Sequence, residues 1–459
     1  MNSNLKEYEN FKKRSIKYLI CLTSCIVKLF IITLSFVFCT TFGFSASKNS
    51  ILKSSAKVPF EWAKFKSQPQ QANYILEGLN SWQNLDIQNV KCLRVVYFYP
   101  KDRLPIQEHR KRWDEIMSDI QNFYRVEMKH LGFGDVTLSL EREKGKLFLH
   151  EVRGVDNDDG YTYKSGGKIR KEVFANLKSK GINPEEETIL IVCGLSRTDG
   201  KKVTIYSPYY GMGANHNRGI CFTADMKWLS ISGLRPDSLK TILQVKEHRG
   251  YEPFSLARFN TTYIGGTIHE LGHGLSLPHN LATKDESKRG TALMGAGNYT
   301  YRKEWRSDEK GSFLTFAHAI RLVVHPLFSG TNKQCNKPPN LTYKALKVFH
   351  RDDTLQIEGT IETEVPTVAM IAYNDRENKG QRGYMVNKDY DATTWTSVIS
   401  PGNKFQIQIA NLREGNHQIR LVSVHANGAT TTKRMHYSSN NRVPNLTRAQ
   451  EEISNIVSD

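Results

Sequence analysis

The feature that most constrains this chain is a pair of histidines, His269 and His273, which are followed six residues later by His279. Residues four apart on a helix project from the same face, so both imidazoles can reach one metal ion. Glu270 directly follows the first histidine and can take a proton from a water held beside the metal. The motif therefore predicts a catalytic Zn2+ site with three imidazole ligands, a fourth position for water, and amide or peptide hydrolysis as its chemistry.

Apolar residues recur at helical spacing through the same segment, which predicts that the motif lies on a helix. This stripe packs on a core and leaves the histidines facing a cleft. Its members are Ile264, Ile268, Leu271 and Leu275. Pro278 disfavours the helical conformation of the residue before it, so His279 is expected to lie off the helix axis.

The segment from His269 to His279 resembles the motif of the metzincin zinc endopeptidases, in which HExxH is followed by a glycine and a third histidine. These enzymes also carry a methionine in a tight turn beneath the metal. The segment Thr291–Gly297 is similar to that turn, with Met294 as its methionine. In some metzincins a tyrosine after the turn contacts the metal or the oxyanion, which makes Tyr299 a candidate accessory residue.

Ser276 departs from the metzincin pattern, because a glycine usually stands at this position. The glycine lets the chain turn sharply, often through backbone angles that cost another residue about 1–2 kcal/mol. The sequence therefore predicts either a different turn or a strained Ser276. Some zincins use a glutamate as third ligand, so Glu286 and Glu304 are the alternatives to His279.

Strand and helix signals before the motif predict an α/β layer. A second resemblance, of Asn122–Gly134 to a motif of secreted, largely uncharacterised bacterial members, extends a metzincin-like catalytic domain over residues 85–330. It implies a twisted mixed sheet that carries the active-site helix. A closing helix is expected from Ser312 to Leu322. We expect strands at 92–99, 136–141, 146–152 and 188–193, and helices at 105–132 and 168–180.

After a polar linker, residues 338–437 alternate apolar and polar side chains between turn residues, which predicts an antiparallel, immunoglobulin-like β-sandwich. Residues 438–459 are expected to form a polar tail with a short helix. Residues 47–84 are an N-terminal arm of unknown role. The sandwich strands are expected at 355–361, 367–373, 405–409 and 418–425.

The first 46 residues have the pattern of a secretory signal. Basic residues precede an apolar run from Leu29 to Phe44, which ends in small residues near Ala46. We expect a secreted or extracytoplasmic protein, which would be membrane-anchored if this segment were not cleaved. Lys28 disfavours the anchor, because a charge within the bilayer is costly.

The cysteine content bears on disulfide bonds, and the net charge bears on the binding partners of the chain. Four of the seven cysteines follow the leader, namely Cys92, Cys193, Cys221 and Cys335, and disulfides and free thiols are both compatible with this number. The formal net charge of +18 favours acidic substrates or an anionic cell surface. No nucleic-acid-binding signature is present, so a nucleic-acid partner is not expected.

Three further segments have weaker signals. An extended substrate is expected to pair with an edge strand around Ile220–Ala224. The acidic run Asp156–Gly160 lacks the spacing of an EF-hand, which favours a solvated turn over a calcium site. His318 and His325 are expected to pack in the core, because the three-histidine set already completes the ligands.

These patterns favour a secreted zinc endopeptidase whose partner is a peptide or protein. Two alternatives stay open. One is a zinc amidase that acts on cell-wall or modified peptides, since the metal site does not define the acyl group. The other is a non-catalytic surface-binding protein that uses the β-sandwich. Closed structural zinc sites need four protein ligands, and Glu270 has no purpose in one.

Overall fold

The computed structural model describes residues 67–83, 91–376 and 391–458, and the predicted secretory signal lies outside these ranges. All described residues belong to one compact unit, Phe60–Asp459. Within the described ranges, no helix has the length and the apolar character needed to cross a bilayer.

A mixed five-stranded sheet forms the centre of the first part of the chain, in the order β4-β1-β5-β9-β8. Four strands are parallel and β8 runs antiparallel at the edge. All six side chains of β5 are buried, as expected for a central strand covered on both faces. The strands are β1 (Arg94–Tyr99), β4 (Leu149–Arg153), β5 (Thr188–Cys193), β8 (Tyr210–Asn215) and β9 (Arg218–Ala224).

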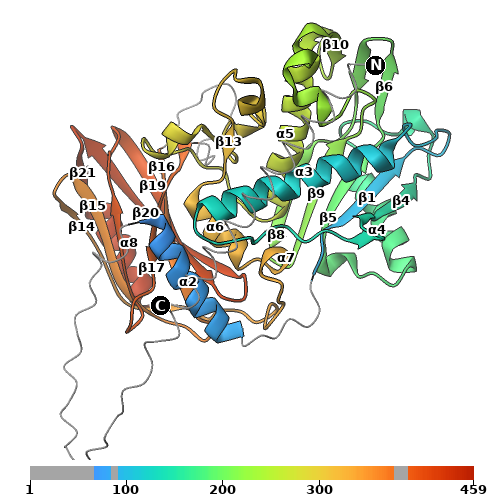
Figure 1. Ribbon diagram of the computed structural model, residues 1–459. Coiled ribbons are helices and arrows are strands. Elements are labelled where there is room, and N and C mark those ends of the chain that lie inside the picture. The colour runs from blue at the N-terminus through green and yellow to red at the C-terminus, as the bar shows by residue number, and fades with distance from the viewer. Residues whose placement is uncertain (1–66, 84–90, 377–390, 459) are drawn as a thin grey trace, which may run out of the picture. The chain divides into compact units, whose positions relative to one another are not determined.

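Helices cover both faces of this sheet, and the alternation along β1 explains how. Val95 and Tyr97 join the large core beneath α3 (His109–His130) and α5 (Leu256–Gly274). Val96 and Phe98 point the other way, into the core beneath α4 (Gly166–Ser179). This period of two is that of a strand buried on both sides. In Figure 1, α3 crosses one face of the sheet.

Smaller elements complete this part of the chain. A second sheet has the order β11-β10-β7-β6, β2 pairs with β3, and β12 pairs with β13. The strands of this second sheet are β6 (Ser196–Asp199), β7 (Lys202–Ile205), β10 (Ile242–Lys246) and β11 (Glu252–Ser255). The strands of the two short pairs are β2 (Arg142–Glu143), β3 (Lys146–Leu147), β12 (Thr291–Ala292) and β13 (Ser312–Phe313). Helices α6 (Phe316–Val323) and α7 (Pro326–Ser329) follow, and the 3-10 turns are η2 (Asp158–Gly160), η3 (Pro184–Glu186), η4 (Ser232–Leu234), η5 (Pro236–Lys240), η6 (Glu286–Arg289), η7 (Gly297–Tyr299) and η8 (Lys303–Arg306).

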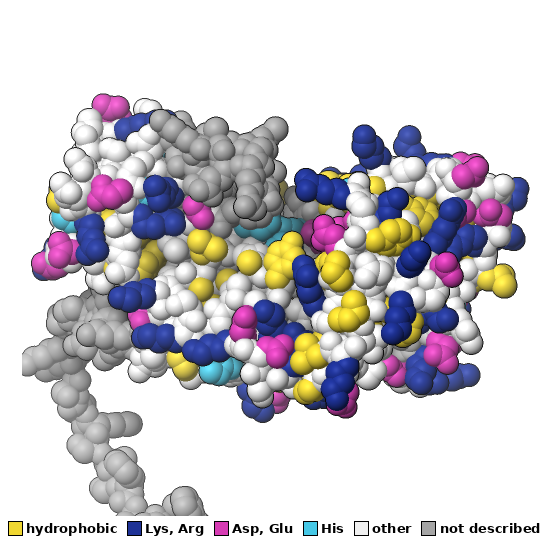
Figure 2. Space-filling view, turned by 90° about the horizontal axis from the view of Figure 1, so that it is seen from above, with side chains coloured by type: hydrophobic (Ala, Val, Ile, Leu, Met, Phe, Trp, Pro, Cys, Tyr) yellow, Lys and Arg dark blue, Asp and Glu magenta, His cyan; other side chains and the backbone are white. Residues whose placement is uncertain are grey.

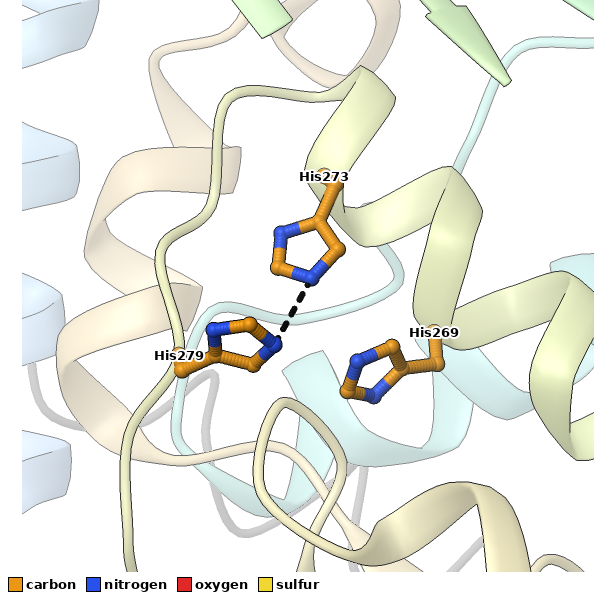
Figure 3. A group of neighbouring side chains, drawn as sticks. All are labelled: His269, His273 and His279. Carbon is orange, nitrogen blue, oxygen red and sulfur yellow. Dashed lines mark hydrogen bonds between the residues drawn. The ribbon is translucent and has the colours of Figure 1, made fainter. Parts of the chain in front are cut away.

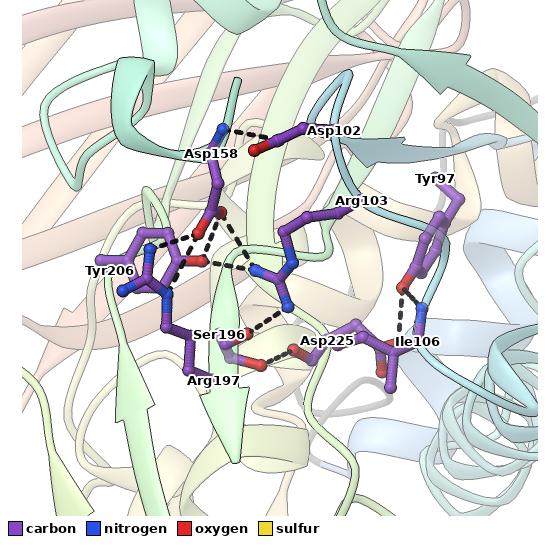
Figure 4. Close-up of polar contacts among 9 residues, drawn as sticks. All are labelled: Tyr97, Asp102, Arg103, Ile106, Asp158, Ser196, Arg197, Tyr206 and Asp225. Atoms are coloured by element: carbon purple, nitrogen blue, oxygen red, sulfur yellow. Dashed lines mark hydrogen bonds and ion pairs between the residues drawn. The ribbon is translucent and has the colours of Figure 1, made fainter. Parts of the chain in front are cut away.

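The acidic run Asp156–Gly160 belongs to an ion-pair network (Figure 4). The carboxylate of Asp158 accepts hydrogen bonds from Arg103 at 3.0 Å and from Tyr206 at 2.5 Å, and it also pairs with Arg197. Burial opposes its ionisation, yet these donors hold the pKa of Asp158 below its usual value. Asp158 is therefore buried and neutralised by guanidinium groups, whereas the other four residues of the run are exposed, as expected for a solvated turn. Among the described residues, no carboxylate set for a metal ion lies there.

The last third of the chain folds into two antiparallel sheets, of orders β14-β15-β18 and β17-β16-β19-β20-β21, around a common apolar core. All four strands expected here are present, while β14, β17, β20 and β21 add to them. An immunoglobulin-like topology stays a prediction. The strands are β14 (Thr342–Arg351), β15 (Thr354–Glu362), β16 (Thr367–Arg376), β17 (Thr393–Val398), β18 (Lys404–Ile409), β19 (Gly415–His425), β20 (Thr430–Asn440) and β21 (Val443–Asn445).

Two terminal helices pack on these sheets. Helix α8 (Thr447–Ser458) buries Ala449, Ile453 and Ile456 in their core, so the polar tail expected here contributes to the packing. Helix α2 (Gln68–Gln83) contacts β16 and β17, and its buried side chains join the core that also lies beneath α3 and α5. The same core includes Ile371 of β16 and Val422 of β19. The two parts of the chain therefore share one apolar interior.

Several expectations need correction. Ile220–Ala224 is not an edge strand, because β9 pairs with β5 on one side and with β8 on the other. The closing helix begins after Thr315, since Ser312 lies in β13. The expected strand at 136–141 reduces to a bridge between Leu93 and Leu140. The four described cysteines are free thiols.

Close packing of α5 against β8 and β9 depends on glycines, which gives a first prediction. A Cβ added at Gly219 would lie 1.7 Å from the carbonyl oxygen of Gly274, so Gly219→Ala must push the helix from the sheet. We expect this overpacking to lower the free energy of unfolding by about 1–3 kcal/mol or more. Denaturant unfolding of the purified variant measures it.

Gly78→Ala is the matched control, because Gly78 lies within α2 and no heavy atom lies within 4 Å of the added Cβ. Its helix propensity should make that variant more stable by about 0.5–1 kcal/mol. Equal effects of the two substitutions would show that the contact of α5 with the sheet is not tight.

Candidate active site

The three histidines of the motif converge, as the sequence predicts. His269 and His273 project from α5, and His279 lies on the segment that follows this helix (Figure 3). One ring nitrogen of each lies within 4.8 Å of the others, and Nε2 of His273 is 3.0 Å from Nε2 of His279. Among the described residues, this is the one group of three or more such side chains arranged to hold a metal ion.

Backbone carbonyls orient two of the rings. Nδ1 of His269 is 2.8 Å from the carbonyl oxygen of Leu293, and Nδ1 of His273 is 2.9 Å from that of Leu277. Each Nδ1–H donates to its carbonyl, so each Nε2 keeps its lone pair for a metal. Burial, followed by the neighbouring His273, lowers the pKa of His269 to about 3. The ring is therefore neutral, which is the form that binds a metal.

The segment that carries His279 is held at two points. The amide of Asn280 donates to the carbonyl of Met294 at 3.3 Å, and the amide of Leu281 donates to the carbonyl of Ala392 at 2.7 Å. The second contact reaches the residue before β17. Both sides of the fold therefore fix the position of the third imidazole.

Glu270 lies on the adjoining face of α5, beside the histidines. Its Oε2 accepts a hydrogen bond from the backbone amide of Gly211, on the edge strand β8, at 2.7 Å. Burial raises the pKa of Glu270 to about 7, although this hydrogen bond favours the ionised carboxylate. A carboxylate held in one direction, with a pKa close to neutrality, is suited to accept and return a proton.

Ser276 adopts the left-handed conformation, with φ of 63°, so the chain makes the sharp turn and the residue is strained. Two hydrogen bonds hold it there. The Oγ of Ser276 donates to the carbonyl of Asn215 at 2.9 Å. The carbonyl of Ser276 accepts a hydrogen bond from Nη2 of Arg321 at 2.6 Å. The serine hydroxyl thus fastens the turn to the end of β8, which a glycine could not do.

Met294 is fully buried and packs against α5. A Cβ added to Gly272 would lie 2.3 Å from its sulfur, so the thioether fits against α5 because residue 272 has no side chain. The preceding residue, Leu293, supplies the carbonyl that orients His269. The turn therefore links the methionine to the ligand geometry through its backbone.

Other candidate residues lie elsewhere. Glu286 accepts hydrogen bonds from the amide and hydroxyl of Thr283, and Glu304 lies 3.7 Å from Arg302, so neither replaces His279. His318 and His325 are buried in the core, as expected. Tyr299 is 60% exposed and lines a cavity together with Glu270.

Two cavities flank the histidines along β8. One, of about 210 Å³, contains Glu270 and is lined by Tyr163, Tyr209, Tyr263 and Glu247. The other, of about 860 Å³, contains His273 and extends to strands β19 and β20. Figure 2 views the molecule from above, with histidine side chains toward the middle of the face. Tyr209, the residue before β8, lines the smaller cavity, and Gly211, Gly213 and Asn215 of β8 line the larger one.

Sequence reasoning missed the role of β8. Its glycines, Gly211 and Gly213, permit the close approach of α5, since added Cβ atoms would lie 1.9 Å from the Glu270 carbonyl oxygen and 2.4 Å from Ser276 Oγ. The spacing of the two glycines two residues apart, on one face of a strand, was the available signal.

No protein-family model matches this chain, and no curated protein matches it. Solved structures of OgpA from Akkermansia muciniphila do match. Wild-type OgpA is 26% identical with a TM-score of 0.63, over 77% of this chain and 97% of OgpA. A catalytically inactive OgpA in complex with an O-glycopeptide (glycodrosocin) substrate is 26% identical with a TM-score of 0.62, over 77% and 96%. The mixed α/β architecture described above is therefore similar to that of OgpA.

Two substitutions of Ser276 test the strain and the hydrogen bond at this turn. Ser276→Ala keeps the left-handed strain and loses the hydrogen bond to Asn215, which should lower the free energy of unfolding by about 0.5–1.5 kcal/mol. Ser276→Gly loses the same bond but also removes strain of about 1–2 kcal/mol, so its stability should lie close to that of the wild type. Chemical denaturation of the two variants in parallel measures the order, and an alanine variant as stable as the glycine variant would contradict it.

Proposed function

We propose that this chain is an exported, zinc-dependent endopeptidase of metzincin type. The observation that carries the proposal is the convergence of three imidazoles beside a partly buried carboxylate that an edge-strand amide holds in place. The similarity to OgpA, which has been crystallised with a glycopeptide substrate, supports a peptide as the substrate class. The secretory pattern of residues 1–46 supports export.

The ligand set fits zinc, which favours three protein nitrogens and an open position in catalytic sites. His269, His273 and His279 would hold the ion. When bound, zinc supplies Lewis acidity, which lowers the pKa of a coordinated water and polarises a substrate carbonyl. Glu270 accepts the proton of the attacking water and passes it to the leaving amine, while the Gly211 amide keeps its carboxylate aimed at the site.

The edge strand β8 gives the direction of a bound chain. β8 runs from Gly211, beside Glu270, to Asn215, beside Ser276. A peptide added antiparallel to this edge therefore has its N-terminal residues beside Asn215 and its C-terminal residues beside Glu270 and the 210 Å³ cavity. β8 takes the substrate-binding place first expected at Ile220–Ala224.

Replacement of Glu270 by glutamine tests the general base. Glu270→Gln keeps the shape of the side chain and an acceptor for the Gly211 amide, so zinc content should equal that of the wild type. Turnover of a peptide substrate should fall at least about 100-fold, because proton transfer contributes about 10²–10⁴-fold. Metal analysis by mass spectrometry and peptide cleavage assays, on the same preparations, measure both quantities.

His279→Ala is the companion variant, which should lose both metal and activity. Near wild-type cleavage by Glu270→Gln would contradict the assigned base, and full zinc retention by His279→Ala would contradict the third ligand. A zinc amidase that acts on cell-wall peptides would cleave cell-wall fragments while leaving unmodified peptides intact.

The cavity beside Glu270 favours a second, finer proposal, that the preferred substrates carry an O-linked sugar just after the scissile bond. Its lining combines aromatic rings with hydroxyl and carboxylate groups, which suit a sugar. Tyr263 donates its hydroxyl to Glu247 at 2.7 Å, and the ring of Tyr163 contacts His248 with centroids 4.4 Å apart. The O-glycopeptide substrate bound to OgpA is the second support.

Paired peptides test the sugar preference. A peptide with an O-linked sugar on the residue after the scissile bond should be cleaved at least about 10-fold faster than its unmodified twin, because the carboxylate of Glu247 can accept a sugar hydroxyl. Glu247→Ala should reduce this ratio, whereas the distant Glu358→Ala in β15 should not. Equal kcat/KM values for the twin peptides with the wild-type enzyme would rule the preference out.

A further inference from the structure

The larger cavity beside the histidines carries cationic side chains. Arg321, Arg420, Arg434 and Lys337 line it, and none of its described lining residues is an aspartate or a glutamate. Lys337 is paired with Glu364 at 3.1 Å, and Arg321, Arg420 and Arg434 are the other cationic side chains of the lining. Neutral donors from Asn215, Asn217, Thr430 and Thr432 complete the polar wall. The surface is therefore suited to a negatively charged group.

Two of these arginines face each other across neighbouring strands. Arg420 of β19 is in direct register with Arg434 of β20 in the antiparallel pair. Side chains in this position lie on one face of the sheet with Cβ atoms about 4.5–5.5 Å apart, and like charges there repel. An anion that lies between the two guanidinium groups can accept hydrogen bonds from both.

The third arginine connects this charge to the active site. Nη1 of Arg321 is 3.4 Å from the Tyr373 hydroxyl, and the Arg420 guanidinium lies over the Tyr373 ring, 4.9 Å from its centroid. Tyr373 thus holds both guanidinium groups around one ring. Nη2 of Arg321 donates to the Ser276 carbonyl, in the turn between His273 and His279. The cationic surface begins at the loop that presents the third ligand.

The direction of β8 says which part of a substrate reaches this cavity. Gly211, beside Glu270, lines the cavity together with Gly213 and Asn215. Ser276 contacts both Asn215 and Arg321, which places Arg321 beside the far end of β8. A strand advances about 3.4 Å per residue, so this end of the cavity lies roughly two to four residues before the scissile bond of an antiparallel peptide.

We propose that the cavity lined by Arg321, Arg420 and Arg434 is an anion-binding subsite for a carboxylate that the substrate carries on the N-terminal side of the scissile bond. The inference rests on the proposed peptidase function for its direction along the substrate. The carboxylate can belong to an aspartate or glutamate side chain or to an acidic sugar attached there. Either source presents the same planar group to the guanidinium forks.

Peptide pairs that differ only by glutamate or glutamine test the subsite. The residue is placed two, three or four positions before the scissile bond, and kcat/KM is measured for each pair. We expect the wild-type enzyme to prefer glutamate by about 10-fold or more at one of these positions, as for a charge-assisted hydrogen bond. A ratio near one at every position overturns the proposal, unless a third peptide with a carboxylated sugar there is preferred over its neutral-sugar counterpart.

Variants of Arg434 assign the effect to the cavity. The side chain is exposed, so its replacement should leave the fold and the melting temperature intact. Arg434→Gln should reduce the glutamate preference to about 3-fold or less, and Arg434→Glu should reverse it in favour of a lysine peptide. Arg351→Gln is the matched control, because Arg351 lies on β14 and does not line the cavity. An equal loss of preference in this control would assign it to net charge and overturn the subsite.

A binding experiment distinguishes the anion-binding subsite from the proposed peptidase function. Calorimetric titration of the Glu270→Gln protein with the same peptides requires no cleavage. If the wild type cleaved no peptide, the proposed function would fail, but tighter binding of glutamate peptides that depends on Arg434 would still establish the subsite. If cleavage occurred and binding of the glutamate and glutamine peptides were equal, the subsite alone would fail.

Discussion

The close approach of helix α5 to strands β8 and β9 is the contact on which the rest of the site depends. It is possible because Gly211, Gly213 and Gly219 present no side chain to the helix, and because its own Gly274 faces the sheet. The same approach brings the Gly211 amide within hydrogen-bonding distance of Glu270 and the end of β8 within reach of Ser276. A larger residue at these positions would move Glu270, His273 and the turn at Ser276 together, since all three are carried by one rigid helix and its end.

Around this contact, hydrogen bonds with backbone groups fix the orientation of the side chains of the site. The carbonyls of Leu293 and Leu277 set the tautomers of His269 and His273, and the Gly211 amide sets the direction of Glu270. Backbone groups in packed elements are more rigid than side chains, so they leave the side chains of His269, His273 and Glu270 little freedom to move. The left-handed backbone of Ser276 is strained, and two hydrogen bonds across the turn offset this strain.

The sequence predicted the convergence of the three histidines because their geometry is local, while the roles of Glu270 and Met294 stay predictions. Spacing along one helix is enough to bring His269 and His273 together, and a proline two residues after Ser276 is enough to end that helix. The strand β5 was predicted at its observed bounds, since five apolar residues in a row after Thr188 are typical of a strand buried on both faces. The edge strand was misplaced because pairing is non-local: β9 is the more apolar segment, yet the glycine-bearing β8 lies outside it. The strands β14 and β20 were missed because exposed polar residues interrupt them, and only their cross-strand partners define them.

The β-sheets after residue 338 are part of the site rather than an appended module. Ile371, Tyr373 and Val422 share the apolar interior with α5 and α6, so removing these sheets would expose that interior to water. The amide of Leu281, two residues beyond the third histidine, donates to Ala392 at the start of β17, and Arg420 and Arg434 form one wall of the cavity beside His273. Helix α5 carries His269, His273 and Glu270, while the sheets hold the segment of His279 and add charge to the cavity beside His273. Because the two parts share a core, a substitution of a buried residue in the sheets, such as Ile371 or Val422, should also alter the position of His279, whereas an exposed residue of the cavity wall can change without such an effect.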